Sequence, residues 1–208
     1  MKIKHIVFQK KAKRYEMNFY SDEIINDILD HAPLESLIDT LDTFKEKTRN
    51  TLHRFSGNDI QTKYVDALLG DERNKVVFYC MDHEFAIDNC PVIMIYRKSR
   101  EETRYYILML CTKPNFRKQG YASKLLDGFV EKVREEQTQK QEQTKKQEQT
   151  QKQEKIKIIL SSVETAVLFY EAYGFRWTID TLSDHEVLTE IEKDEEGKEY
   201  FIMELLIK

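Results

Sequence analysis

The stretch from residue 105 to residue 133 constrains the fold of this chain more than any other. Residues 105–112 are a continuous run of apolar and β-favouring side chains, which Lys113-Pro114-Asn115 then interrupts. Beyond a short loop that contains Gly120, apolar side chains recur at helical spacing: Ala122, Leu125, Leu126, Phe129, Val130 and Val133. The pattern predicts a strand, a turn, a glycine-containing loop and a helix with one buried face.

The loop before this predicted helix suits a phosphate group. The first turn of a helix presents backbone N–H groups that lack intrahelical acceptors, and the helix dipole is positive there. Gly120 lets the backbone approach a ligand closely, because glycine has no side chain. The sequence therefore predicts that the loop holds a phosphorylated small molecule. On this segment alone, a helix whose entry loop merely contains a glycine is an open alternative.

A second segment repeats the order of strand and helix. Residues 155–160 are expected to form a strand, and Ser161 to begin a helix, because Ser161 and Glu164 stand at capping-box spacing. An apolar helix face follows at Ala166, Phe169, Tyr170 and Tyr173. Gly174 stands where a C-cap glycine belongs, and residues 175–179 are expected to resume as a strand.

Together the two segments resemble the signatures of the GCN5-related N-acetyltransferase (GNAT) family. Residues 110–114, followed by Arg117-Lys118-Gln119-Gly120-Tyr121-Ala122, resemble its acetyl-CoA motif, Q/R-x-x-G-x-G/A. Residues 166–175, read as AVLFYEAYGF, resemble its second signature, A-x-x-x-Y-x-x-x-G-F. The closing run over residues 200–207 is similar to the last strand of the family. The resemblance covers about residues 75–208.

The resemblance implies an α/β fold, in which a mixed, mainly antiparallel sheet is flanked by helices, and an acetyl-CoA-dependent N-acetyltransferase. The acetyl group would pass directly to an amine acceptor, on a small molecule or a protein, without a metal. By the same resemblance, the backbone of Leu110, Cys111 and Thr112 would face the thioester. The pyrophosphate would be held mainly by main-chain N–H groups of the motif: Arg117, Lys118, Gln119, Gly120, Tyr121 and Ala122.

Tyr170 matches the general acid of the family. A phenol with a pKa of about 10 can deliver a proton to a thiolate whose conjugate acid has a pKa near 8.5. Spacing alone favours a packing role beside Phe169 and Tyr173, whereas the family match favours a role at the sulfur. Two positions depart from the family pattern. Val163 replaces an asparagine that often contacts the cofactor, and Thr112 replaces a hydrophobic residue.

The group that deprotonates the amine is not identified by the sequence. A lysine-like amine with a pKa near 10.4 costs about 4.6 kcal/mol to deprotonate at pH 7, so a carboxylate or a water chain should assist. Glu84, Asp88, Glu101 and Glu102 are candidates, and none is favoured over simple solvation. Cys111 could carry an acetyl group covalently, but a cysteine within an apolar strand is more often a small core residue.

Composition sets broad limits on the function. The chain has 208 residues, enough for one domain with a substantial core. We expect a single domain, with residues 1–74, a strand plus helices, on the acceptor side and residues 75–208 as the acetyl-CoA-binding core. The formal net charge of −4 argues against a nucleic-acid partner bound through bulk positive charge. The five histidines lack metal-ligand spacing.

The cysteines and the hydropathy pattern predict a compartment. The three cysteines are odd in number and lack C-x-x-C spacing, so we expect neither disulfides nor structural zinc, and a reducing environment. No apolar run is long enough to span a membrane, and the first residues lack the apolar core of a signal peptide. These features predict a cytoplasmic protein without a membrane partner.

The remaining elements are read from periodicity and breakers. A short strand is expected over residues 3–8. Ser21 is expected to cap a first helix, and further helices are expected over residues 34–52 and 60–70. Strands are expected over residues 76–81 and 92–96, before the strand that begins at residue 105.

One segment does not belong to this pattern. Residues 137–142 read QTQKQE, and the hexapeptide recurs over residues 143–148, with Lys145 replacing glutamine, and unchanged over residues 149–154. Because it contains no apolar residue, this insertion cannot bury a face against a core. It is either a solvated extension of the preceding helix or a flexible loop. Two other functions stay open: a catalytically degenerate acetyl-CoA-binding protein, or an interaction protein that uses the Gln-rich insertion.

Overall fold

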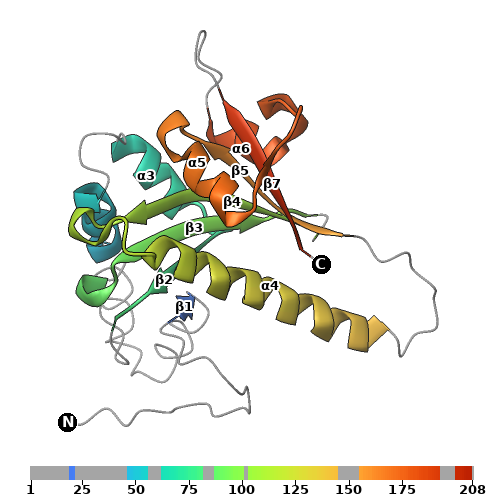
Figure 1. The fold of residues 1–208 in the computed structure, drawn as a ribbon, viewed down its shortest axis with the longest axis horizontal. Coiled ribbons are helices and arrows are strands. Elements are labelled where there is room, and N and C mark those ends of the chain that lie inside the picture. The colour runs from blue at the N-terminus through green and yellow to red at the C-terminus, as the bar shows by residue number, and fades with distance from the viewer. Residues whose placement is uncertain are drawn as a thin grey trace.

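The protein is built around a seven-stranded sheet with helices on both faces (Figure 1). The computed structural model describes residues 19–21, 46–55, 62–81, 87–100, 103–144, 155–192 and 200–207. The strands are β1 (Phe19–Ser21), β2 (Asn74–Tyr79), β3 (Val92–Lys98), β4 (Arg104–Thr112), β5 (Ile156–Ser162), β6 (Arg176–Trp177) and β7 (Phe201–Ile207). Their spatial order is β1-β2-β3-β4-β5-β7-β6.

Neighbouring strands are antiparallel except for β4 and β5, which are parallel. A parallel pair needs a crossover connection, and the long helix α4 (Tyr121–Thr144) lies in it. The other helices are α3 (Thr62–Gly70), α5 (Glu164–Tyr173) and α6 (Glu186–Ile191), and residues 46–55 are also helical. Short 3-10 turns are η1 (Ile87–Asn89), η2 (Pro114–Phe116) and η4 (Leu182–Asp184). The mixed, mainly antiparallel sheet predicted from the sequence is confirmed.

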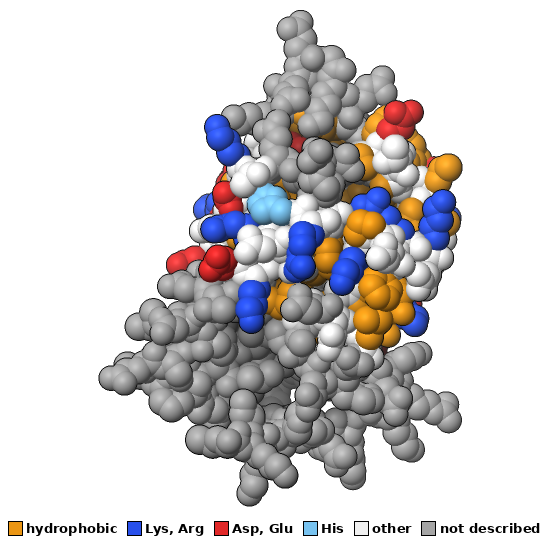
Figure 2. Space-filling view, turned by 90° about the vertical axis from the view of Figure 1, so that its left-hand side faces the viewer, with side chains coloured by type: hydrophobic (Ala, Val, Ile, Leu, Met, Phe, Trp, Pro, Cys, Tyr) orange, Lys and Arg blue, Asp and Glu red, His pale blue; other side chains and the backbone are white. Residues whose placement is uncertain are grey.

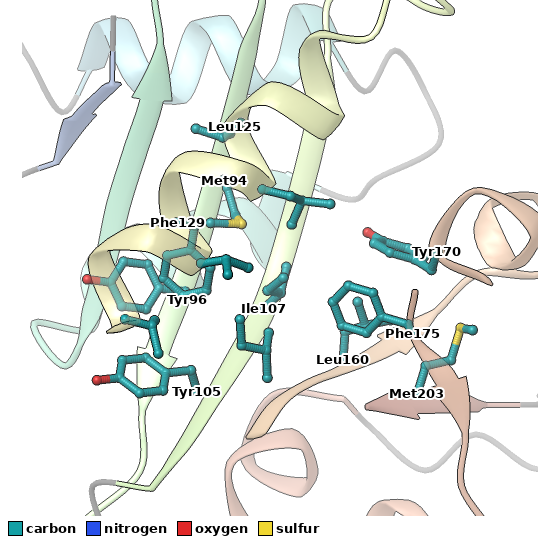
Figure 3. Close-up of a cluster of buried hydrophobic side chains, with 14 of the residues drawn as sticks. Met94, Tyr96, Tyr105, Ile107, Leu125, Phe129, Leu160, Tyr170, Phe175 and Met203 are labelled. Carbon is teal, nitrogen blue, oxygen red and sulfur yellow. The ribbon is translucent and has the colours of Figure 1, made fainter. Parts of the chain in front are cut away.

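The helices divide between two hydrophobic clusters. One cluster contains buried side chains of α4 and α5, and the other contains those of α3, α6 and the helical residues 46–55. The buried stripe of α4 is the predicted one, since Leu125, Phe129 and Val133 are fully enclosed. Phe129 packs on Tyr96 of β3 with ring centroids 4.7 Å apart (Figure 3). Burial of each such side chain contributes about 1.5–3 kcal/mol.

The two parallel strands β4 and β5 stay together for only part of their length. Their pairing runs from Arg104↔Lys157 to Ile107↔Leu160. Beyond Leu160, β5 pairs with β7 alone, and the end of β4 pairs with β3 alone. Leu108 is an extra residue on β4, because the register against β3 shifts between Ile95 and Tyr96. The edge of β4 that would face β5 is therefore open over residues 108–112.

A buried arginine fixes α6 to the sheet. Arg97 of β3 is only 4% exposed, and its guanidinium donates to Asp71 Oδ2 at 2.5 Å, Glu190 Oε2 at 2.6 Å and Asn74 Oδ1 at 2.7 Å. Arg73 contacts the same two carboxylates from the outside. Two arginines and two carboxylates thus balance in charge, which a buried guanidinium requires. The network joins the turn after α3, the strand β3 and the helix α6.

One local prediction about a serine is wrong, and another is not tested. Ser21 is the last residue of β1, and the helix that it was expected to cap lies outside the described residues. Ser161 does not cap α5. Ser161 pairs with Ile202 of β7, so β5 continues to Ser162 and the N-cap of α5 is Val163, without a side-chain cap. Strand pairing overrides the local capping preference.

Other local predictions can be compared element by element. Gly174 caps α5 as predicted: its φ is 123°, and its N–H donates to the carbonyls of Tyr170 and Glu171. The strand expected over residues 175–179 is only two residues long. The helix observed over residues 46–55 overlaps the end of the helix predicted over residues 34–52. The rest of that predicted helix, and the strand predicted over residues 3–8, lie outside the described residues. The sequence pattern did not predict α6.

The prediction of unpaired cysteines is wrong. Cys80 and Cys90 form a disulfide, with Cα atoms 4.0 Å apart. Cys80 follows β2 and Cys90 precedes β3, and the antiparallel pairing of the two strands brings the cysteines together. An odd number of cysteines in the sequence does not reveal such a contact. The argument for a reducing compartment therefore loses its basis. Cys111 is a free, buried thiol.

The repeat insertion begins as helix. Residues 137–144 continue α4 by two turns, which confirms the helical extension for this part, and residues 145–154 lie outside the described residues. Glu136, just before the repeat, accepts hydrogen bonds from Lys98 Nζ at 2.8 Å and from the Tyr105 hydroxyl at 2.6 Å. No segment long and apolar enough to cross a membrane is found among the described helices.

The Arg97 network predicts a loss of stability in acid. Hydrogen bonds from Arg73, supported by the charge of Arg97, lower the pKa of Asp71 from about 3.8 to about 2. Because the folded-state pKa is the lower one, the stabilisation is complete above pH 4 and is lost as the pH falls toward 2. We expect Asp71→Asn to lower the free energy of unfolding by about 2 kcal/mol at pH 7 and to flatten its decline between pH 4 and 2 in urea titrations.

The control is Asp66→Asn, which removes one partner of the half-exposed Arg49–Asp66 pair. An exposed pair contributes about 0–1 kcal/mol, so this variant should unfold nearly as the parent does. Equal effects of the two substitutions would show that the Arg97 network does not stabilise the fold more than a surface pair.

Candidate active site

The loop between β4 and α4 has an unusual backbone. After η2, Lys118 has a φ of 61° and Gly120 a φ of 81°. A positive φ is uncommon for a residue with a side chain and marks a backbone held by its surroundings. Left-handed residues within a loop turn successive N–H groups into a concave arrangement that favours anions. The loop that the sequence singled out therefore has the backbone geometry of an anion-binding turn.

The N–H groups of this loop are available to a ligand. Among the described residues, no backbone carbonyl accepts from the N–H groups of residues 118–123, and the first such bond of α4 is Lys124 N–H to Gly120 O at 3.1 Å. A Cβ placed on Gly120 would meet no heavy atom within 4 Å. Open space therefore lies directly above unpaired donors at the positive end of a helix of 24 residues.

The side chains of the motif mostly brace the loop. Arg117 donates from Nε to the Thr112 carbonyl at 3.2 Å and from Nη2 to the Phe55 carbonyl at 3.0 Å. Gln119 Nε2 donates to the Asn115 carbonyl at 2.8 Å. The guanidinium thus ties the loop to β4 and to helix 46–55, and its charge acts on a nearby ligand through space.

The face around the loop is rich in cations. Figure 2 views the side on which α4 begins and shows several Lys and Arg side chains across its middle, between hydrophobic ones. Lys118 is exposed, and Lys124 Nζ lies 5.2 Å from the ring centroid of Tyr121. The Tyr121 ring itself packs against Phe116 at 5.7 Å and Tyr79 at 6.0 Å. Of Tyr121 and Ala122, the backbone is therefore the part that faces a ligand at the helix start.

Tyr170 reaches the open edge of β4 from α5. Its side chain is 8% exposed, and in Figure 3 its hydroxyl points from α5 toward β4. The ring packs edge-on against Phe169 at 5.1 Å and Phe175 at 5.4 Å. Burial, and then the charge of Cys111, raise the pKa of Tyr170 above its ordinary value. The ring is thus a packed core group, while its hydroxyl stays protonated beside β4.

The end of β4 lies between the loop and Tyr170. Leu110, Cys111 and Thr112 pair with β3 on one side and have no strand on the other in the described part of the chain. Burial raises the pKa of the Cys111 thiol to about 11, although the charge of Arg117 opposes the shift. A protonated thiol is a poor nucleophile. The structure therefore favours the core role of Cys111 over the covalent one.

Comparison with models of protein families identifies the family of this chain. The family model described as an acetyltransferase (GNAT) domain matches residues 74–177, half of the 208-residue chain. The chain belongs to the GNAT acetyltransferase family. The match spans β2 to β6 and so includes the loop before α4, the separated strands β4 and β5, and Tyr170. No curated protein sequence matches the chain.

Solved structures show the same fold at low sequence identity. GCN5 of Tetrahymena is 15% identical, with 80% of this chain and 88% of that chain covered and a TM-score of 0.54. A GNAT acetyltransferase of Staphylococcus aureus Mu50 is 13% identical, with coverages of 80% and 94% and a TM-score of 0.52. The ribosomal-protein-S18-alanine N-acetyltransferase of Escherichia coli is 14% identical, with coverages of 80% and 89% and a TM-score of 0.50. These likenesses show the GNAT fold.

The structure adds two polar residues to this GNAT domain that the sequence analysis did not select. The Tyr64 hydroxyl of α3 lies 3.1 Å from the carbonyl oxygen of Leu108 and 3.1 Å from Glu192 Oε1, at the end of α6. Tyr64 lies within the helix predicted over residues 60–70, but the sequence analysis gave it no role. Its partners lie 44 and 128 residues away in sequence, so no local signal could connect them.

The base candidates named from the sequence are not placed by the structure. Glu84, Glu101 and Glu102 lie outside the described residues, and nothing is described of the Asp88 side chain. Within the described ranges, no group of three or more His, Cys, Asp or Glu side chains could hold a metal ion. His185, one of the histidines without metal-ligand spacing, is buried beside the Tyr106 hydroxyl at 3.3 Å.

Two cavities in the described part of the protein lie away from the GNAT motifs. One, of about 400 Å³, lies between α4, the end of β3 and the beginning of β4, with Tyr96, Tyr105 and Glu136 in its wall. The other, of about 220 Å³, lies beside His185, Lys157 and Glu204. The candidate active site, which we call the notch, is instead the place beside the start of α4 where residues 108–112 of β4 run without β5 as a neighbour.

Cys111 provides a chemical test of this geometry. We expect native Cys111 to react slowly with iodoacetamide at pH 7 and faster as the pH rises toward 11, because alkylation requires the thiolate. Mass spectrometry of the alkylated peptide measures the rate. The same experiment counts thiols: unfolding without a reductant should expose only Cys111, and reduction should release Cys80 and Cys90 as well. Rapid native alkylation at pH 7 would contradict the buried position of Cys111.

Proposed function

We propose that the protein is an acetyl-CoA-dependent N-acetyltransferase that passes the acetyl group directly to an amine. One observation carries the proposal. The notch combines a loop whose N–H groups lack backbone acceptors, the edge of β4 at residues 108–112 without a neighbouring strand, and the protonated hydroxyl of Tyr170, which points toward β4. Acetyl-CoA supplies a thioester and a pyrophosphate, and these three features match both groups.

The loop and the strand edge would bind and polarise the donor. The N–H groups of Lys118 to Ala122 would hold the pyrophosphate at the positive end of α4. The N–H groups of Leu110 or Thr112, which face away from β3, would donate to the carbonyl oxygen of the thioester as negative charge develops there, whereas the N–H of Cys111 faces Ile93 of β3. Each backbone donor aimed at such a charge contributes about 2.7–4 kcal/mol to lowering the barrier.

Tyr170 would protonate the sulfur as the thiolate leaves. Its raised pKa keeps the hydroxyl protonated at neutral pH, so the proton is present when the sulfur needs it. The ring contacts with Phe169 and Phe175 fix the direction of the hydroxyl. The acceptor would approach from the other face of the sheet, where α3, within residues 1–74, and α6 lie.

The catalytically degenerate alternative differs from the proposal in one measurable property. Val163, which replaces the usual asparagine, is exposed at the start of α5 and offers no polar side chain to a cofactor. A protein that binds acetyl-CoA but acetylates no amine would support this alternative. No observation favours the interaction function of the repeat, whose first eight residues are a helical extension.

Substitution of Gly120 tests the cofactor site. Gly120→Glu should abolish the rise in melting temperature that acetyl-CoA produces in the parent, because the side chain fills the open space above the loop and repels phosphate. Gly70→Glu is the matched control, since Gly70 also has open space around it but lies at the end of α3. Gly120→Ala separates backbone strain from charge. An unchanged shift in Gly120→Glu would place the phosphate site elsewhere.

Substitution of Tyr170 tests the general acid. Tyr170→Phe should lower kcat by about one to two orders of magnitude, because a general acid is worth about 10²–10⁴-fold and water can replace part of it. Acetyl-CoA affinity should stay nearly constant, since the ring is kept. Tyr173→Phe is the control: it removes a hydroxyl from the same helix, where that group bonds Asp127 at 2.9 Å. Equal kcat in the two variants would leave Tyr170 a packing residue only.

A further inference from the structure

The acceptor side of the notch carries a polar cluster that the GNAT motifs do not include. It consists of the Tyr64 hydroxyl, the Leu108 carbonyl oxygen and the Glu192 carboxylate, with both oxygens 3.1 Å from the hydroxyl. Leu108 is the extra residue of the β4 bulge, at the point where β4 leaves β5. The cluster therefore lies at the notch itself, and Tyr64 and Glu192 reach it from α3 and α6.

Tyr64 and Tyr170 approach the same part of β4 from opposite faces of the sheet. Tyr64 packs against the cluster that contains α3 and α6, whereas Tyr170 belongs to the cluster that contains α4 and α5. Burial is the main cause of the raised pKa of each phenol, and the charge of Cys111 adds to both shifts. Both hydroxyls thus lie near the C-terminal part of β4, one on each face of the sheet.

The cluster has more acceptors than donors. The Tyr64 hydroxyl has one proton and lies between two acceptors, so at any moment one of them receives no proton from it. Glu192 is half-buried, and no Lys, Arg or His among the described residues forms an ion pair with it, whereas Glu190, two residues earlier, is paired with Arg73 and Arg97. A protonated amine carries up to three N–H donors and a positive charge. It would therefore supply both the hydrogen-bond donors and the cation that this cluster lacks among the described residues.

We propose that Tyr64, the Leu108 carbonyl and Glu192 bind the acceptor as an alkylammonium group, and that Glu192 removes its protons. The proposal rests on the proposed acetyl transfer. The first proton passes from nitrogen through Glu192 to solvent. The neutral nitrogen then forms the N–C bond with the thioester carbonyl, the C–S bond breaks, and the second proton leaves nitrogen for Glu192, which releases it to solvent. The thiolate takes the proton of Tyr170, which solvent replaces, so that one proton is released per acetyl group.

The surroundings of Glu192 are consistent with a base that exchanges protons with solvent. Among the described residues, Glu192 contacts the hydroxyl of Tyr64 on α3, and the charge of Cys111 on β4 acts on the same hydroxyl. The neighbouring Glu190 on α6 is held by the Arg97 network, which fixes the end of the helix and with it the position of Glu192. Glu192 is half-buried, so part of the residue is in contact with solvent.

The test compares Glu192→Gln with Glu186→Gln, which removes an exposed carboxylate from the same helix. Acetyl-CoA is the donor, and the acceptors are spermidine, glucosamine, a peptide with a free N-terminus and a lysine peptide. We expect Glu192→Gln to lower kcat/KM about 10²-fold or more and to lose the rise of kcat/KM with pH on the acid side. The deficit should shrink near pH 10, where solvent itself deprotonates a lysine-like amine. Glu186→Gln should match the parent.

Tyr64→Phe separates positioning from chemistry. We expect a smaller fall in kcat/KM, mainly through KM, with the pH dependence retained, because Glu192 is still present. Melting temperature and acetyl-CoA affinity should change little in either variant, whereas a structural role would move both. If the parent acetylates an amine and Glu192→Gln keeps its rate and pH profile, the inference is overturned while the proposed function stands. If the parent acetylates none of the acceptors, the proposed function itself is overturned.

Discussion

The separation of β4 from β5 is the constraint on which the rest of this structure depends. A parallel pair normally satisfies its backbone groups along its whole length, but here the pairing stops at Ile107↔Leu160. The Leu108 bulge shifts the register against β3, and beyond Leu160 the strand β5 keeps only its pairing with β7. Unpaired backbone groups near a protein interior are costly unless a partner satisfies them. The open edge at residues 108–112 is therefore a place that favours a ligand with hydrogen-bonding groups.

The hydrophobic core holds the notch open from both faces. On one face, α4 is fixed by the stripe that includes Leu125 and Phe129, and this places the unpaired N–H groups of its first turn beside the end of β4. On the other face, α3 and α6 pack on the sheet, and Arg97 joins them through Asp71 and Glu190. Helices and strands thus carry or adjoin the polar groups of the candidate site, and Arg117 and Gln119 brace the loop before α4 by hydrogen bonds to backbone carbonyls.

Much of the candidate site was predictable because its signals are local. The loop around Gly120 and the α4 stripe depend on spacings within about 30 residues, and the structure confirms the strand–loop–helix order that they predict. Wrong predictions arose where a distant strand competed with a local preference. Ser161 has the spacing of a cap but pairs with β7, and Cys80 meets Cys90 only because β2 and β3 form a hairpin.

The sequence by itself determined the GNAT family signatures, the buried face of α4 and the residues at which α4 begins and α5 ends, since backbone propensity, hydrophobic periodicity and glycine positions act over a few turns. Only the tertiary structure decided which side chains meet across the notch. Tyr64 and Glu192 are 128 residues apart and carry no shared local pattern, yet sheet order and helix packing bring them to the Leu108 bulge. Contacts of that kind follow from the packing of whole elements, which no short window of sequence encodes.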